Sequence, residues 1–192
     1  MTVTIDNLRS QTKQADAVSE FETLFQEHWS RIYAVIFRIV GDPDEAEDLA
    51  LETFLKLHGK LEGTSGLKIS PIRSSWRGWL YRVATNLGLN ALRARKRRVR
   101  YELEAGKISL EAAPSENPAV AIERAEQRQR VRQILSEMKP RSAKILVLRH
   151  SGLSYGEIAA AVRVSPNSVG KLLSRAETDF ERLYQALEGD QK

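Results

Sequence analysis

Apolar residues recur at three- and four-residue steps through most of this chain, a spacing that predicts helices rather than strands. The first such run lies at 21–39, and Gly41 is suited to end a helix there. A second run begins after Asp42, a favourable helix N-cap, and Pro43, which fits the first helical position. A third run leads into the sequence RARKRRVR at 93–100. The pattern therefore predicts an all-α fold class.

Two internal stretches interrupt the helical pattern. Residues 59–75 are rich in Gly, Ser and Pro and predict a loop, and the segment around Pro114 and Pro118 predicts a flexible linker. The chain begins with a polar stretch that has no periodicity, which we expect to be disordered. The predicted divisions are a disordered N-terminal tail at 1–19, a small helical domain at 20–100, a flexible linker at 101–120, a second small helical domain at 121–187 and a C-terminal tail at 188–192.

The composition narrows the classes of function. The 192 residues include 30 Lys and Arg against 25 Asp and Glu, so the formal net charge is +5, which fits a polyanionic partner but is weak evidence by itself. The chain has no cysteine, which excludes disulfides and thiolate metal sites, and its three histidines form no ligand pair. We therefore expect no metal and no cofactor. The polar N-terminus and the lack of a long apolar run predict a cytoplasmic protein without membrane insertion.

The most specific motif is a pair of short capped helices near the C-terminus. Ser154 and Glu157 fit a capping box for the first helix. After a turn at 163–165, Ser165 is placed to cap the second helix and Pro166 to begin it. This layout predicts a helix-turn-helix, whose second helix enters the DNA major groove; a plain helical hairpin is the alternative. The polar and basic residues that would face DNA are Arg149, Ser165, Asn167, Ser168, Lys171, Ser174 and Arg175.

A basic stretch at 93–100 extends the third helical run, and six of its eight residues are Lys or Arg. A charge run is often just a solvated helix face. Asn86 and Asn90 precede this run, however, and Trp76 and Trp79 lie further upstream, and a mixture of cationic and aromatic groups suits a strand of unstacked bases. Trp79 also fits the apolar face of the helix, so a core role is the alternative for that side chain.

An acidic stretch, DPDEAEDLALE at 42–52, holds six carboxylates and no basic residue. The helix dipole explains acids in the first turn but not Asp48 and Glu52, which lie further along and four residues apart. An exposed acidic stripe on a basic protein indicates a protein partner with a basic surface. A catalytic carboxylate pair is the sharper alternative, and no His, Lys or metal-ligand set accompanies these residues.

Taken together, four segments in order resemble the extracytoplasmic-function sigma factors of the sigma-70 family. These segments are LFQEHWSRIY, DLALETFLKLH, WRGWLYRVATNLGLNALRARKRR and LSYGEIAAAVRVSPNSVGKLLSRA, and the resemblance extends from about residue 20 to about residue 185. It implies that 20–100 is the region 2 domain and 121–187 is region 4. It also implies a transcription initiation factor that is not an enzyme.

The resemblance implies partners and roles by position. The partners are core RNA polymerase, through its β′ clamp helices and β flap, promoter DNA, and an anti-sigma factor. Residues matching the polymerase-binding surface are Asp48, Leu49, Leu51, Glu52 and Phe54. Residues matching the reader of the −10 promoter element are Asn86, Asn90, Arg93, Arg95, Lys96, Arg97 and Arg98. The helix-turn-helix residues named above would read the −35 element in duplex form.

Several positions depart from the family pattern. Leu51 stands where Gln is frequent, and Gly170 and Leu172 stand where basic residues are common. Among other classes of function, a helix-turn-helix regulator that binds duplex operator DNA without polymerase is the main alternative. An enzyme is disfavoured because the sequence has no P-loop, no Gly-rich dinucleotide turn and no Ser-centred elbow. A helical scaffold gives no reason for the basic stretch and the tandem caps together.

Overall fold

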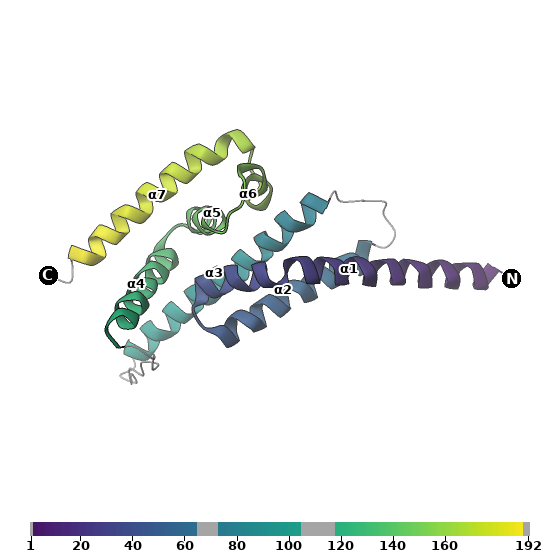
Figure 1. Cartoon of the computed structure of the whole chain (residues 1–192), viewed down its shortest axis with the longest axis horizontal. Coiled ribbons are helices and arrows are strands. Elements are labelled where there is room, and N and C mark those ends of the chain that lie inside the picture. The colour runs from purple at the N-terminus through teal and green to yellow at the C-terminus, as the bar shows by residue number, and fades with distance from the viewer. Residues whose placement is uncertain (1, 65–72, 105–117, 190–192) are drawn as a thin grey trace.

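The computed structural model of the chain describes residues 2–64, 73–104 and 118–189, and every regular element within these ranges is an α-helix. The predicted all-α fold class is thus confirmed. Three helices form an N-terminal lobe, in which each packs against the other two (Figure 1). They are α1 (Thr2–Val40), α2 (Pro43–Thr64) and α3 (Arg73–Glu104).

Four further helices form a C-terminal lobe. In it α7 packs against α4, α5 and α6, and α5 also contacts α6. The lobe follows α3 in the chain after residues 105–117, which lie outside the described ranges. Its helices are α4 (Pro118–Glu137), α5 (Pro140–His150), α6 (Tyr155–Val162) and α7 (Pro166–Gly189).

The N-terminal residues differ from their predicted disorder, because α1 begins at Thr2 and runs unbroken to Val40. Neither Pro nor Gly occurs in this helix, and once the packed part has formed a helix, adding further turns requires no new nucleation. In Figure 1 the N-terminal part of α1 projects past the neighbouring helices. Low apolar content indicated weak packing there but did not determine the backbone conformation.

The predicted loop and tail are shorter than expected. Helix α2 continues through Gly59 to Thr64, and α3 already begins at Arg73. The side chain of Leu61 is 5% exposed, so packing on the core extends α2 past a residue of low helix propensity. Residues 65–72 and the greater part of the predicted linker lie outside the described residues, as do residues 190–192 of the predicted C-terminal tail.

A continuous apolar core holds the N-terminal lobe together. Its fully buried members include Ile32 and Ile39 of α1, Phe54 of α2 and Leu80 of α3. Gly88 permits close packing of α3 on α1, because a Cβ atom there would lie 3.0 Å from Cδ1 of Ile39. A larger residue at this position would push α3 away from α1 and so displace the exposed face of α3.

The turn between α1 and α2 follows the predicted chemistry. Gly41 has a φ of +79°, a left-handed conformation that glycine adopts without strain. Asp42 caps α2, since its Oδ1 accepts a hydrogen bond of 2.8 Å from the backbone N–H of Glu45. Pro43 is the first residue of the helix. These local signals fix the start of the acidic helix.

The helix-turn-helix prediction for the C-terminal lobe is confirmed in its backbone. Ser154 accepts a hydrogen bond from the Glu157 backbone, and the Glu157 side chain accepts one in return, so the predicted capping box caps α6. Helix α6 ends at Val162, and α7 begins at Pro166. Arg163 makes the turn in the left-handed region at φ +56°, which the sequence did not indicate.

Candidate functional site

The exposed face of α2 combines acidic and apolar side chains. Asp48 is exposed, Leu51 is 44% exposed and Leu55 is 70% exposed, while Glu52 is half-buried. Steps of three and four residues place these four on one face of the helix, which we call the α2 ridge. Glu52 pairs with Lys56 within the helix at 3.1 Å. An acidic surface with large exposed apolar groups is suited to binding a protein with a basic surface.

Two neighbours on α2 differ from the sequence prediction. Phe54 is 1% exposed and lies in the core, where its ring is 4.8 Å from that of Phe25, so it supports the α2 ridge from beneath and offers no contact surface. The sequence analysis did not single out Leu55, although it is the most exposed large apolar side chain in the described structure. Leu49 is half-buried. The helical period alone could have separated these positions.

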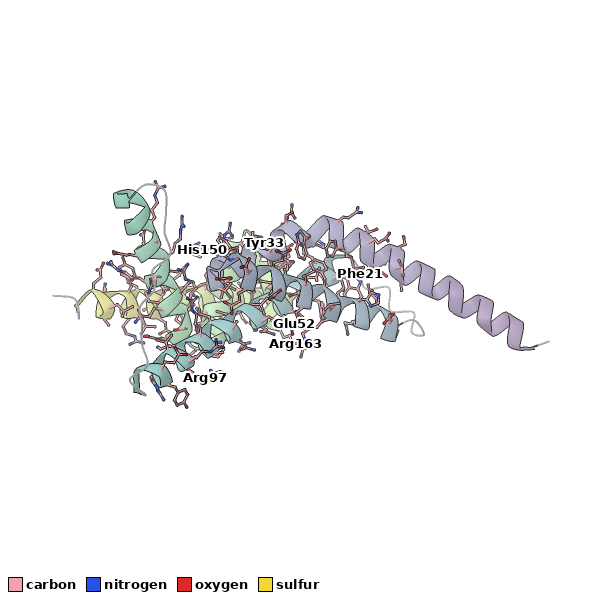
Figure 2. The ribbon with its side chains drawn as sticks, turned by 90° about the horizontal axis from the view of Figure 1, so that it is seen from below. Phe21, Tyr33, Glu52, Arg97, His150 and Arg163 are labelled. Atoms are coloured by element: carbon pink, nitrogen blue, oxygen red, sulfur yellow. The ribbon has the colours of Figure 1, made fainter. Side chains whose placement is uncertain are left out.

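A polar and basic stripe runs along α3. Asn86 and Asn90 are exposed and one turn apart, and Arg93 and Arg97 continue the same face. The basic stretch lies in the same unbroken helix, so its charges are held on a rigid support. Glu52 on α2 and Arg97 on α3 are both labelled in Figure 2. The exposed basic residues of the stretch are Arg95, Lys96, Arg97, Arg98 and Arg100.

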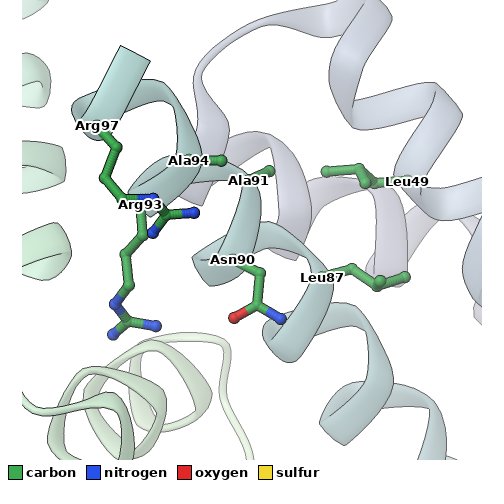
Figure 3. Close-up of a pocket in the computed structure, with 7 residues that line it drawn as sticks. All are labelled: Leu49, Leu87, Asn90, Ala91, Arg93, Ala94 and Arg97. Carbon is green, nitrogen blue, oxygen red and sulfur yellow. The ribbon is translucent and has the colours of Figure 1, made fainter. Parts of the chain in front are cut away.

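A shallow hollow of about 500 Å³ lies between α2 and this stripe. Figure 3 shows Leu49 on one side and the two arginines on the other, with Asn90 between them. Its floor is aliphatic, and its rim offers amide and guanidinium donors, a combination suited to a flat polar group attached to an anion. The residues that line it are Leu49, Leu87, Asn90, Ala91, Arg93, Ala94 and Arg97.

The two tryptophans upstream of the stripe are largely structural. Trp76 is 4% exposed, and its Nε1–H donates a hydrogen bond of 3.1 Å to Oε1 of Glu20. Trp79 is half-buried against the core and meets Trp76 edge-on, with 6.1 Å between ring centres. Their placement favours the core role for Trp79 over a stacking surface for bases.

The second helix of the helix-turn-helix presents a polar face. Val169, Leu173 and Ala176 of α7 are buried against the lobe, as the spacing predicted. Ser165 and Ser168 are joined through their hydroxyls at 2.7 Å. The exposed polar and basic residues on this surface are Arg149, Ser165, Asn167, Ser168, Lys171, Ser174 and Arg175. This group can donate hydrogen bonds to phosphates and base edges.

Charge and burial single out two further residues, Glu157, which the sequence analysis placed only in the capping box, and Lys144, which it did not name. Burial raises the pKa of Glu157. Hydrogen bonds from Ser154 and the nearby charges of Arg77 and Arg31 lower this pKa by more, so that it lies below 4.5. Burial is the main cause of the lowered pKa of Lys144, and the nearby Arg82 and Arg93 lower that pKa further. Both residues lie where α3 meets the C-terminal lobe, a contact between distant segments that has no local sequence signal.

Within the described residues there is no cluster of His, Cys, Asp or Glu that could hold a metal ion. Nor is any helix in the searched part of the chain long and apolar enough to cross a membrane. The candidate functional surfaces are the α2 ridge, the α3 stripe with its hollow, and the exposed face of α7.

Two family models match the chain. The model described as sigma-70 region 2 matches residues 24–98, and the model described as sigma-70 region 4 matches residues 128–179. The first covers most of the described N-terminal lobe, including both α2 and the α3 stripe. The second runs from within α4 into α7 and includes α6, the turn and the first part of α7.

Relatives match over most of the chain. It is 30% identical to the RNA polymerase sigma factor YlaC of Bacillus subtilis, over 84% of this chain and 90% of the relative. It is 29% identical to the RNA polymerase sigma-H factor of Pseudomonas aeruginosa, over 87% of each. For the ECF RNA polymerase sigma factor SigE of Mycolicibacterium smegmatis, the identity is 28%, and the match spans 83% of this chain but 59% of the relative.

Two solved structures share the fold. CnrH, in complex with the cytosolic domain of CnrY, gives a TM-score of 0.55 at 19% identity, covering 94% of this chain and 97% of that one. The sigma factor RpoE of Bartonella quintana, in complex with the anti-sigma factor NepR, gives a TM-score of 0.51 at 19% identity, covering 86% and 97% respectively.

Proposed function

Because the chain belongs to the sigma-70 family and is an extracytoplasmic-function sigma factor, we propose that it binds core RNA polymerase and directs it to promoter DNA. In this role it opens DNA by capturing bases and carries out no catalytic step of its own. Polymerase and chromosome share the bacterial cytoplasm, so we propose that compartment as its place of action. The observation that carries the proposal is the adjacency, in one lobe, of an acidic apolar ridge and a basic stripe.

We assign polymerase binding to the α2 ridge, with the β′ clamp helices as its partner. Asp48 and Glu52 supply the charge, and the exposed Leu51 and Leu55 supply apolar area that a partner would cover. Leu51 replaces a frequent Gln of the family, so this contact is more apolar here. The C-terminal lobe would contact the β flap.

We assign recognition of the −10 element to the α3 stripe. Asn86 and Asn90 would hydrogen-bond to unpaired bases, and the hollow beside Asn90 offers room for a base edge. The cations of the basic stretch would bind phosphates of the separated strand, which makes binding sensitive to salt. The predicted roles of Arg95, Lys96, Arg97 and Arg98 fit their exposure.

We assign recognition of the −35 element to the start of α7. Its exposed polar face fits the major groove, and Lys171 and Arg175 lie one turn apart on it. Gly170 costs this helix about 1 kcal/mol relative to Ala. Gly170 lies beside Tyr155, because a Cβ atom placed on the glycine would be 3.7 Å from Cε2 of the tyrosine ring.

An anti-sigma factor is a further proposed partner. It is supported by the two solved relatives, CnrH and RpoE, each of which is in complex with a second protein.

Run-off transcription with purified core polymerase and a promoter library tests the proposal. Asn86→Ala should reduce initiation and leave polymerase binding intact, whereas Asp48→Lys with Glu52→Lys should abolish polymerase binding. Glu22→Lys with Glu27→Lys makes the same change in charge on exposed α1 positions and should retain both activities. Failure of the parent protein to associate with core polymerase, or tight binding to duplex DNA without it, would contradict the proposal.

A further inference from the structure

A group of cations lies where α3 meets the C-terminal lobe. Helix α3 contacts both α5 and α6. Lys144 of α5 interacts electrostatically with Arg82 and Arg93 of α3. Arg82 interacts in the same way with Arg163, in the turn after α6. We call these four residues the junction cations. Three separate segments of the fold therefore bring like charges together.

The backbone around the junction cations is closely packed. Gly78, one turn before Arg82, is buried, and a Cβ atom placed on it would lie 3.4 Å from the Cβ of Ala160 in α6. Arg163 follows just after and makes the turn in the left-handed conformation, at φ +56°. These side chains therefore extend from backbone positions that helix packing and a defined turn determine.

Carboxylates do not neutralise this group. In the described part of the chain, the junction cations other than Arg93 form no ion pair and no side-chain hydrogen bond. Two carboxylates that meet α3 pair with other cations. Glu157 Oε1 lies 2.9 Å from Arg77 Nη1, and Glu137 Oε1 lies 2.7 Å from Lys96 Nζ. The positive charge of the group is therefore left without an acidic partner.

Arg93 meets only a partial negative charge. Its Nη2 donates a long hydrogen bond of 3.4 Å to the carbonyl oxygen of Met138. Met138 lies just past the C-terminal end of α4, where the helix dipole contributes roughly half a negative charge. A half charge beside four cations leaves the group strongly positive.

The junction cations are also partly removed from water. Burial lowers the pKa of Lys144 and that of Arg82, and the neighbouring cations lower both further. Like charges repel more strongly where solvent screening is reduced. Partly buried charges in proteins are usually paired. The fold thus contains an unfavourable group of charges that a bound anion would stabilise.

The extent of the group indicates the kind of anion. Arg82 and Arg93 are separated by about three turns, or about 16 Å along the axis of α3. Lys144 interacts with both, so one short ion can contact only part of the group. A chain of linked phosphates carries several charges and many acceptor oxygens, which suit guanidinium and ammonium donors.

We propose that the junction cations form a binding site for a small oligophosphate anion, either inorganic or carried by a nucleotide. Arg93 belongs both to this site and to the α3 stripe, whereas Lys144 and Arg163 belong to the C-terminal lobe and are absent from the stripe. The site does not depend on the proposed function, because its occupancy can be measured on the free protein without polymerase or DNA.

Isothermal titration calorimetry of the full chain with inorganic triphosphate, at constant ionic strength, tests the proposal. We expect one anion to bind per chain. Lys144→Gln should bind at least about tenfold more weakly, because it loses a charge-assisted hydrogen bond to phosphate. Arg182→Gln makes the same change in charge at an exposed position of α7 and should bind like the parent.

Thermal unfolding gives an independent readout. Without anion, Lys144→Gln should unfold at a temperature at least as high as the parent, because one source of repulsion is removed. Triphosphate should raise the midpoint of the parent but not that of the variant. Arg163→Asn covers the case in which Lys144→Gln does not fold, since Asn tolerates the left-handed conformation, and it should also lose the response. An equal increase in the parent and the variants would overturn the proposal.

Titration with ATP distinguishes the two sources of the anion. Equal affinities for ATP and triphosphate would assign recognition to the phosphates alone, and tighter binding of ATP would add a contact to the base or sugar; both results support the site. Binding of neither anion would overturn it. So would a loss in Lys144→Gln that is confined to single-stranded DNA, because these cations would then belong to the DNA-binding surface.

Discussion

The guanidinium carbon of Arg149, at the end of α5, lies 5.5 Å from the centre of the Tyr155 ring at the start of α6. Arg149 is exposed and is assigned to DNA, whereas Tyr155 was not singled out in the sequence. The stacking restricts the arginine before DNA arrives, which lowers the entropy lost upon binding. We therefore expect Tyr155 to act as a positioning residue for the proposed DNA contact of Arg149.

Replacing Tyr155 with Leu should weaken binding of the polymerase complex to a −35 duplex. A cation–π contact at an exposed site contributes about 0.5–1 kcal/mol, which corresponds to about two- to fivefold in affinity. Tyr155→Phe keeps the ring and should bind like the parent. Fluorescence anisotropy with labelled duplex measures the effect, and equal affinities for all three proteins would refute the role of Tyr155.

Removing the side-chain hydroxyl that caps α6 should lower stability without changing any residue assigned to DNA. Ser154→Ala deletes the acceptor for the Glu157 backbone N–H and should cost about 1 kcal/mol in the free energy of unfolding. Urea denaturation followed by circular dichroism measures this loss. Ser174→Ala, at an exposed position within α7, is the matched control and should unfold at the parental urea concentration.

The neighbours Phe54 and Leu55 should separate stability from partner binding. Phe54→Ala leaves a cavity in the core and should cost about 3–5 kcal/mol of stability. Leu55→Ala, at a 70% exposed position, should leave the urea midpoint nearly unchanged and weaken capture of core polymerase. A Leu55→Ala protein that binds polymerase like the parent would show that Leu55 does not contribute to polymerase binding.

The salt dependence of DNA binding should report on the basic stretch. Arg97→Ala with Arg98→Ala removes two phosphate contacts, so the slope of log affinity against log salt should become shallower by about 1.4 for a single strand. Arg124→Ala with Arg182→Ala removes two exposed cations elsewhere and should keep the parental slope. Titrations of single-stranded −10 DNA at several salt concentrations provide the comparison.

His28 should make stability depend on pH. It is 3% exposed, and burial lowers its pKa below 6.5, more strongly than Glu27 raises it. The unfolded chain then binds a proton at a higher pH than the folded chain does, so this stabilisation is complete above 6.5 and decreases as the pH falls through and below that value.

Urea unfolding at about pH 7 and about pH 5 tests the role of His28. His28→Gln should lose less stability between the two conditions than the parent, whereas His150→Gln, at an exposed position, should behave as the parent does. An identical loss in all three proteins would assign the pH dependence to other groups.

Local chemistry made much of this fold predictable. The cap at Asp42, the left-handed Gly41 and the box formed by Ser154 and Glu157 each depend on neighbouring residues, so their sequence signals are strong. The positions of Asn86 and Asn90 on an exposed face follow equally from helical periodicity.

Tertiary packing determined what the sequence did not reveal. Leu61 extends α2 past Gly59 because a core exists to receive its side chain. The pairing of Arg77 with Glu157 joins the two lobes, and neither residue alone indicates the other. Such relationships need the relative placement of helices, which helical period and capping signals do not specify.

Helix α3 is a single unbroken rod from Arg73 to Glu104. The side chains along it therefore have fixed directions relative to one another around the helix axis, because a rotation at one end is transmitted to the other. Inserting one residue just after Asn90 would swing Arg93 and all that follows by about 100° around the axis. Side chains on the exposed face of this helix can thus be exchanged one at a time, but the length of the helix can change only in steps that restore its phase.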